Sequence, residues 1–191
     1  MRRLRIVPRW AGHPESDFYP WLTRALLEGE ERSPYRDVRA LAMPDPNLPT
    51  IDAWVGRLSA ELERDLGAAQ ETVLVGHSVG CQALLRYLAS LPQGVTFRGA
   101  LLVAGWLSID TPWDSIRPWI ETSFDLARAR ERVSDLVVLL SDNDPFTADY
   151  QENKRAWEER AAARVVVAPG AKHFNAAEEP AVLDILLNSF Q

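Results

Sequence analysis

The chain has 191 residues, of which 47% are hydrophobic and 25% charged, and its formal net charge is −6 at pH 7. These values are typical of a globular protein, and we expect residues 1–191 to form a single domain. No apolar run reaches the roughly 18 residues that a membrane span needs, and no block of Lys and Arg indicates a nucleic-acid partner. The basic N-terminus lacks the apolar stretch of a signal peptide, and the only cysteine is Cys81. We therefore expect a cytoplasmic protein.

Six short apolar runs alternate with amphipathic segments along the chain. Apolar runs of this length are typical of buried parallel strands. The predicted strands are Leu4–Val7, Val38–Ala42, Val73–Val75, Ala100–Ala104, Leu136–Leu140 and Val165–Val167. The predicted helices lie near residues 17–28, 51–66, 80–91, 147–162 and 177–190. This alternation predicts an α/β protein, a three-layer sandwich around a mainly parallel six-stranded sheet with right-handed crossovers.

A segment at about residues 105–119, between the fourth and fifth predicted strands, breaks the alternation. It is rich in tryptophan and proline, which makes it a stiff, aromatic excursion at the carboxyl edge of the sheet. Ligands of open α/β sheets bind at that edge, and long loops are often functional. Part of the segment packs over the end of the sheet, and we expect Trp106 or Trp113 also to line a substrate pocket.

The most informative motif is Gly-His-Ser-Val-Gly at residues 76–80, where the third predicted strand meets a predicted helix. Strand, Gly-x-Ser-x-Gly and helix together describe a nucleophile elbow, in which a serine sits on a sharp turn above the sheet. The glycines remove Cβ atoms that would collide as strand and helix close. The N-terminus of the helix directs free N–H groups at a developing oxyanion. Ser78 is therefore the predicted nucleophile.

A serine nucleophile needs a histidine base, and the chain has three histidines. His77 lies inside the motif, where its side chain should point away from the serine hydroxyl. His13 lies in the loop after the first strand. His173 follows the last predicted strand, which places it at the carboxyl edge, and it comes after the serine in the chain. We predict that His173 is the base; the alternative is a surface histidine.

The base needs a carboxylate from another strand end between Ser78 and His173. Ser-Asp-Asn-Asp-Pro-Phe at residues 141–146 follows the fifth predicted strand and offers Asp142 and Asp144. We favour Asp144, because the proline after it fixes the turn before the next helix. Asp142 is the alternative acid, or it caps the loop or binds nearby backbone N–H groups.

An oxyanion hole needs at least two hydrogen-bond donors. One predicted donor is the backbone N–H of Val79, directly after the nucleophile. The second should come from the loop after the first strand, where the N–H of Trp10 is the best candidate. This loop could otherwise serve only as the connection from strand to helix.

Four features together resemble the retinoblastoma-binding-protein-9/YdeN family of small α/β-hydrolase-fold serine hydrolases: Gly-His-Ser-Val-Gly-Cys at residues 76–81 with the Leu-Leu-Arg-Tyr-Leu that follows it, Ser-Asp-Asn-Asp-Pro-Phe at residues 141–146, Lys-His-Phe-Asn at residues 172–175, and Trp-Leu at residues 21–22. The resemblance covers nearly the whole chain. It implies a minimal α/β-hydrolase fold with the strand order 2-1-3-4-5-6. It also implies a catalytic triad that corresponds to Ser78, Asp144 and His173 here.

We therefore expect a serine hydrolase that cleaves a small-molecule carboxylic ester with a small or medium acyl group, through an acyl-enzyme on Ser78. No metal or organic cofactor is needed, and the sequence indicates no protein partner. The alternatives are an amide or thioester hydrolase with the same triad, or a binding module on a hydrolase scaffold with little turnover. Many α/β-hydrolases carry His-Gly or Pro-Gly after the first strand, where this chain has Pro8 and Arg9. The arginine leaves the second oxyanion donor open.

Overall fold

A six-stranded sheet forms the centre of the computed structural model, which describes residues 1–29 and 33–190. The strands, in chain order, are β1 (Arg2–Val7), β2 (Tyr35–Ala40), β3 (Thr72–His77), β4 (Phe97–Val103), β5 (Val133–Ser141) and β6 (Arg164–Ala168). They pair in the order β2-β1-β3-β4-β5-β6, and every pair is parallel. All six predicted strands and the predicted order are confirmed. The second strand lies earlier in the chain than predicted: it spans Tyr35–Ala40, whereas the prediction was Val38–Ala42.

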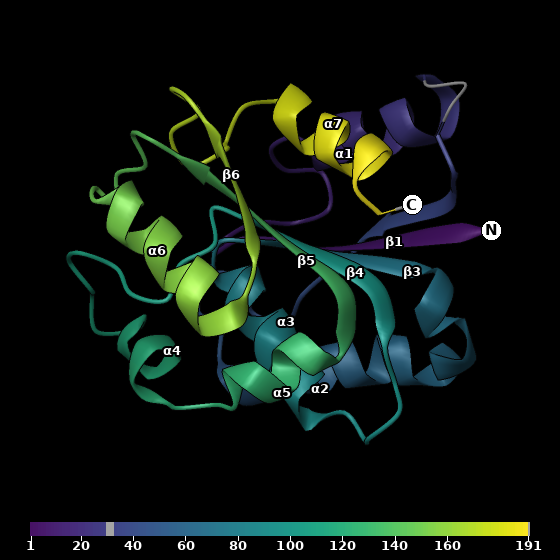
Figure 1. The fold of residues 1–191 in the computed structure, drawn as a ribbon, viewed down its shortest axis with the longest axis horizontal. Coiled ribbons are helices and arrows are strands. Elements are labelled where there is room, and N and C mark those ends of the chain that lie inside the picture. Colours follow the sequence, from purple (N-terminus) through teal and green to yellow (C-terminus); the bar gives the residue numbers. More distant parts are fainter. Residues whose placement is uncertain (30–32, 191) are drawn as a thin grey trace.

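Helices cover both faces of this sheet, which gives the predicted three layers (Figure 1). The α-helices are α1 (Tyr19–Arg24), α2 (Ile51–Leu62), α3 (Val79–Ser90), α4 (Arg117–Glu121), α5 (Leu126–Glu131), α6 (Tyr150–Ala161) and α7 (Pro180–Asn188). Helices α1 and α7 pack on one face of the sheet, whereas α2, α3, α5 and α6 pack on the other. A π-helical turn, Ala25–Gly29, continues α1.

Side chains of the central strands alternate between two apolar cores, because successive residues of a strand point to opposite faces. In β3, Leu74 joins the core beneath α2, α3, α5 and α6, while Val73 and Val75 join the core beneath α1 and α7. Both faces of β3 are therefore buried, and so its sequence is a continuous apolar run and not an alternating one.

Three helical segments differ from the sequence predictions, and one of them is α4, which was not predicted. The helix predicted over 51–66 ends at Leu62, and the chain continues as a 3₁₀ segment, Glu63–Glu71, in which Asp65 has a non-helical backbone. Helix α5 was not predicted. It begins at an Asp125 cap, whose carboxylate accepts a hydrogen bond from the backbone N–H of Arg128 at 2.8 Å. This cap stabilises a helix that is too short to show an apolar period.

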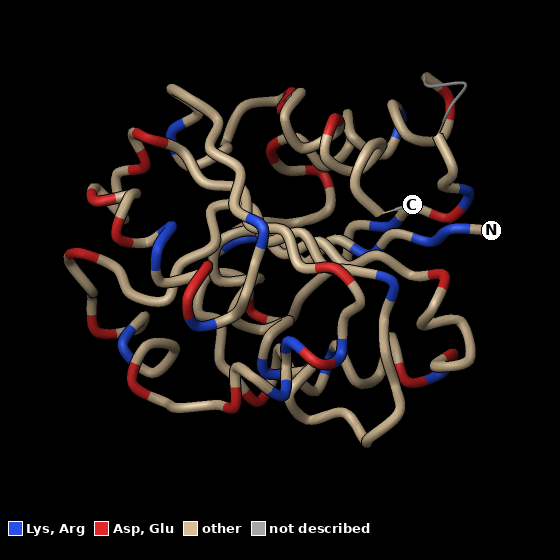
Figure 2. The backbone as a smooth tube through the Cα atoms, viewed as in Figure 1, with Lys and Arg blue, Asp and Glu red and all other residues tan. Residues whose placement is uncertain are grey.

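Charged residues of both signs are spread along the outer loops and helices (Figure 2). Among the described residues, no helix is long and apolar enough to cross a membrane.

The guanidinium of Arg86 links α3 to the segment around α4 through hydrogen bonds. It donates hydrogen bonds to the carbonyl oxygens of Trp119 and Thr122 at 2.8 and 2.7 Å, and to the side-chain oxygen of Gln82 at 2.7 Å. The side chain also lies over the ring of Phe124 at 4.5 Å. Burial lowers the pKa of Arg86 to about 10, which leaves it charged at neutral pH. The excursion after β4 is thus held by a buried cation bound mainly to backbone carbonyls.

We expect Arg86→Met to lower the free energy of unfolding by about 3 kcal/mol, because it leaves the buried carbonyl oxygen of Trp119 and the partly buried one of Thr122 without this donor. Chemical denaturation with matched m-values measures this loss. Arg117→Met is the control, because Arg117 lies on α4 but is half exposed, and its ion pairs with described residues are long, at 3.6 and 3.7 Å. It should change stability by less than about 0.5 kcal/mol. Equal effects of the two substitutions would contradict the role given to Arg86.

Candidate active site

Ser78 occupies the sharp turn between β3 and α3. Its φ and ψ angles are 55° and −119°, a conformation that costs a non-glycine residue about 1–3 kcal/mol. Two hydrogen bonds hold the turn: the N–H of Ser78 donates to the carbonyl of Val103 at 2.9 Å, and the N–H of Cys81 donates to the carbonyl of Ser78 at 2.9 Å. The turn thus has the backbone form of the elbow that the motif predicts. Cys81 is buried at the start of α3, as a small packing residue.

The two glycines of the motif are needed for close backbone approach. A Cβ atom on Gly76 would lie 2.8 Å from the backbone nitrogen of Cys81. A Cβ atom on Gly80 would overlap the carbonyl oxygens of Val7 and Pro8. Gly80 therefore allows the first turn of α3 to contact the end of β1 directly, which brings the loop after β1 next to the serine.

His173 and Asp144 are joined by a hydrogen bond of 2.8 Å between Nδ1 and Oδ2. Both residues are buried. The other carboxylate oxygen of Asp144 accepts the backbone N–H of Phe146 at 2.9 Å, so the carboxylate is fixed at both oxygens. Because a carboxylate only accepts, Nδ1 of the neutral imidazole carries the ring proton, which leaves the lone pair on Nε2. This is the tautomer that a general base needs.

The residues beside Asp144 also hold the loop that carries His173. Asp142 accepts a hydrogen bond from the N–H of Gly170 at 2.7 Å, and Asn143 accepts one from the N–H of Lys172 at 2.7 Å. Asp142 thus binds backbone N–H, in line with the alternative interpretation of this residue, and it is Asp144 that contacts the imidazole. Asn143 was not singled out in the sequence. No local sequence pattern distinguishes it, because its contact with Lys172 exists only once the fold brings the two loops together.

Ser78 and His173 open onto one cavity of about 280 Å³ at the carboxyl edge of the sheet. The cavity is lined by Arg9, Trp10, Ala11, Ser78, Val79, Trp106, Ile109, Trp113, Ile116, Phe146, His173 and Asn175. Every predicted site residue is in this list except Asp144, which lies behind the imidazole. Within the described part of the chain, the Ser78 hydroxyl and Nε2 of His173 make no hydrogen bond to each other or to another residue.

Aromatic rings surround this cavity. Trp10 and Trp113 meet edge to face with centroids 5.5 Å apart, and Phe146 lies 6.0 Å from Trp113 and 4.6 Å from the ring of His173. Trp106 is buried, whereas Trp113 and Phe146 are each 38% exposed. The sequence analysis missed Phe146, although its position directly after Asp-Pro at a strand end was a usable signal.

The loop after β1 carries Arg9 and Trp10 beside the serine. The Arg9 side chain donates to both carboxylate oxygens of Asp17, at 2.8 and 3.0 Å, and to the carbonyl of Trp10 at 2.7 Å. Its charge is therefore balanced within the protein, and it fixes the loop. The backbone N–H groups of Trp10 and Val79 both belong to residues at the cavity, and neither donates to another residue that the structure describes.

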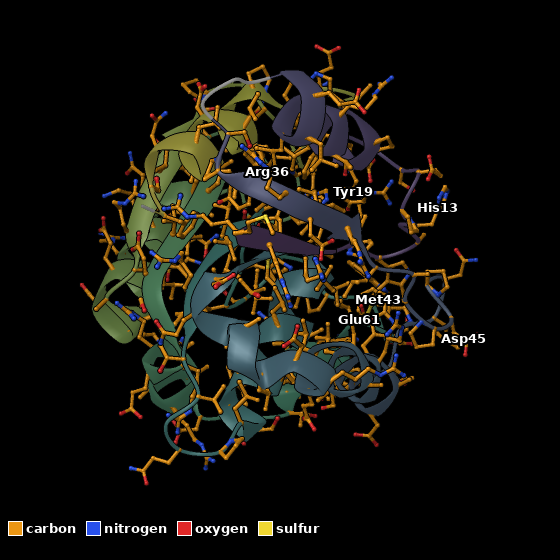
Figure 3. All side chains as sticks on the ribbon, turned by 90° about the vertical axis from the view of Figure 1, so that its right-hand side faces the viewer. His13, Tyr19, Arg36, Met43, Asp45 and Glu61 are labelled. Atoms are coloured by element: carbon orange, nitrogen blue, oxygen red, sulfur yellow. The ribbon has the colours of Figure 1, made fainter. Side chains whose placement is uncertain are left out.

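The other two histidines are placed differently. His77 is fully buried, and its ring nitrogens contact the hydroxyl of Tyr19 at 2.7 Å and the carbonyl of His173 at 2.8 Å. His13 is exposed at the outer edge of the molecule, and Tyr19 lies further inside (Figure 3). Among the described residues, no group of three or more His, Cys, Asp or Glu is placed to hold a metal ion.

Comparisons with known proteins agree with this geometry. YdeN of Bacillus subtilis (strain 168) is 27% identical over 149 residues, which are 76% of this chain and 74% of YdeN. The crystal structure of the ydeN gene product from B. subtilis has a TM-score of 0.82 at 23% identity and covers 100% of this chain and 98% of that one. The structure of a carboxylesterase from Nitrososphaera gargenis has a TM-score of 0.71 at 12% identity, covering 97% and 88% of the two chains. The family model described as serine hydrolase matches residues 4–186. The chain therefore belongs to the serine hydrolase family, with the α/β-hydrolase fold of YdeN.

Proposed function

We propose that the protein hydrolyses carboxylic esters of small or medium acyl groups through an acyl-enzyme on Ser78. The observation that carries this proposal is the buried hydrogen bond from His173 to Asp144, at the rim of the same cavity as a strained serine. Each of the three residues follows a different strand of the sheet, so packing of the central strands fixes their relative positions.

Acylation begins when the Ser78 hydroxyl attacks the ester carbonyl carbon and Nε2 of His173 takes the hydroxyl proton. Asp144 holds the imidazole and stabilises the imidazolium that forms. The N–H groups of Val79 and Trp10 stabilise the negative charge on the carbonyl oxygen. The tetrahedral intermediate then collapses, the bond to the alcohol oxygen breaks, and His173 gives its proton to that oxygen. Contacts between base and nucleophile commonly tighten only when substrate binds, which accounts for the open hydroxyl of Ser78.

Deacylation repeats these steps with water as the nucleophile. His173 accepts a proton from water, the hydroxide adds to the acyl carbon, and collapse releases the acid and returns the proton to Ser78. The cavity has a volume of about 280 Å³. Its walls include Trp106 and Trp113, which suit an apolar acyl group of small or medium size.

The same groups could cleave an amide or a thioester, because the serine attacks the carbonyl carbon of each and His173 can give its proton to a nitrogen or sulfur leaving group as well as to an oxygen. A binding module with little turnover is the candidate from another class. The strained backbone at Ser78 argues against it, since a scaffold that only binds has no need to store about 1–3 kcal/mol at the serine.

Ser78→Ala should lower kcat for an activated p-nitrophenyl ester by about 10⁴-fold or more, because the nucleophile is lost. The fold should persist, because only a hydroxyl without hydrogen bonds to other described residues is removed. Steady-state kinetics, with circular dichroism as the check on folding, measure both effects. A folded Ser78→Ala protein that keeps most of its activity would falsify the proposal.

His173→Ala should be nearly as damaging, and adding it to Ser78→Ala should cost little more, because the residues act as a unit. In the native protein, kcat/KM should rise with pH, since an imidazolium cannot accept the serine proton and a neutral imidazole can. His77 does not add a second step, because burial holds its pKa well below the ordinary value. A pH–rate profile is the measurement, and His13→Gln, at an exposed site, should leave it unchanged. A rate independent of pH from about 5 to 8 with chemistry rate-limiting would count against His173 as base.

The two neighbouring aspartates should differ sharply when each is replaced by asparagine. Asp144→Asn should lower kcat by about 10⁴-fold, because the amide no longer holds the imidazole in the tautomer that accepts a proton. Asp142→Asn should cost far less, because an amide oxygen still accepts the hydrogen bond from Gly170. Kinetics of both variants on one ester decide between them. If Asp142→Asn is the crippled enzyme, the acid has been assigned to the wrong residue.

A further inference from the structure

A chain of three hydrogen bonds, of which the one from Arg9 is part-buried and the two at His77 are buried, joins the loop after β1 to the backbone of His173. The N–H of Arg9 lies 3.1 Å from the hydroxyl oxygen of Tyr19, and this oxygen lies 2.7 Å from Nδ1 of His77. On the other side of the ring, Nε2 of His77 lies 2.8 Å from the carbonyl oxygen of His173. Three residues from separate segments of the chain are thus connected to the residue proposed as the base.

The direction of each hydrogen bond in this chain follows from its ends. The carbonyl oxygen of His173 can only accept, so Nε2 of His77 carries the ring proton and donates it. The neutral ring then offers Nδ1 as an acceptor, and the Tyr19 hydroxyl donates to it. That hydroxyl oxygen in turn accepts the N–H of Arg9. Burial, the largest cause, and the nearby His173 keep the pKa of His77 well below its ordinary value, so the ring stays neutral and the directions do not change near neutral pH.

We propose that Tyr19 and His77 are positioning residues for the hydrolytic reaction, which hold the oxyanion loop and the base at a fixed separation across the nucleophile. The inference rests on the proposed function. At one end of the chain is Arg9, next to Trp10, whose N–H we propose as an oxyanion donor. At the other end is the backbone of His173. Neither Tyr19 nor His77 lines the cavity, so neither touches the substrate.

The loop that carries His173 needs such a support. Lys172 and Phe174, on either side of His173, both have positive φ angles, 52° and 55°, which are unfavourable for residues other than glycine. Hydrogen bonds from the β5 side hold Lys172 and the imidazole, whereas the carbonyl of His173 is held from the opposite side by His77. Loss of the second support lets the strained loop relax and the imidazole move.

The alternative connection between the two loops is weaker. Asn175 donates to Asp17, which binds Arg9, but the distance is 3.4 Å and Asn175 is exposed. A bond at this distance in contact with water exerts little constraint. The connection through Tyr19 and His77 is short, buried and packed against Phe18, whose ring centroid lies 5.4 Å from that of His77.

Tyr19→Phe tests the inference, because it removes one hydroxyl and keeps the ring packing. We expect kcat for an activated ester to fall by about 10–100-fold with KM changed less than about twofold, since misplacement of the base or of an oxyanion donor affects the transition state more than substrate binding. The matched control is Tyr35→Phe. Tyr35 is also fully buried, and its hydroxyl donates to the carbonyl of Leu186 at 3.2 Å, in the same apolar core but away from the cavity.

A role confined to stability predicts that the two variants lose similar stability and keep the native kcat. The positioning role predicts similar losses of stability and a fall in kcat for Tyr19→Phe alone. A kcat of Tyr19→Phe within about twofold of that of Tyr35→Phe overturns the inference. Ser78→Ala, assayed in parallel, separates the two levels of the account: if it is inactive while Tyr19→Phe is native-like, the hydrolase proposal stands and the positioning proposal fails. If Ser78→Ala is active, the hydrolase proposal itself fails.

Discussion

The arrangement of the site depends on the contact between the first turn of α3 and the end of β1. Gly80 makes this contact possible, because any Cβ atom there would overlap the carbonyl oxygens of Val7 and Pro8. The contact places Ser78 at the carboxyl edge of the sheet and the N–H of Val79 beside the loop that carries Trp10. The tight turn also forces the positive φ of Ser78. The close backbone contacts that Gly76 and Gly80 permit offset this strain.

Much of the fold could be predicted, because the central strands are buried on both faces and are therefore continuous apolar runs that local sequence reveals. The predicted bounds of the edge strand β2 were the least accurate, since only part of Tyr35–Ala40 is buried and its run of apolar residues is interrupted. Helix α5 was missed for a related reason: it has six residues, and only Ala129 among them is buried. Short elements held by a cap and by tertiary contacts leave no period in the sequence.

The candidate site shows the same division between local and long-range information. The sharp turn at Ser78 could be predicted because its glycines and its flanking strand and helix are adjacent in the chain. The choice between Asp142 and Asp144 depends on which side chain faces a loop 29 residues away, and the structure shows Asp144 bound to the imidazole. The Tyr19–His77 contact, between residues 58 positions apart, has no local signature at all. The motif identified His77 only as a residue beside the nucleophile.

The central claim is that Ser78 is an activated nucleophile, and labelling with a fluorophosphonate tests it most directly. The serine oxygen displaces fluoride and keeps the phosphonyl group, so mass spectrometry of the digested protein locates the modified residue. The account predicts one adduct per chain on the peptide that contains Ser78, formed much faster in the native protein than in His173→Ala. A folded protein that gains no adduct, or gains it on another residue, would contradict the account.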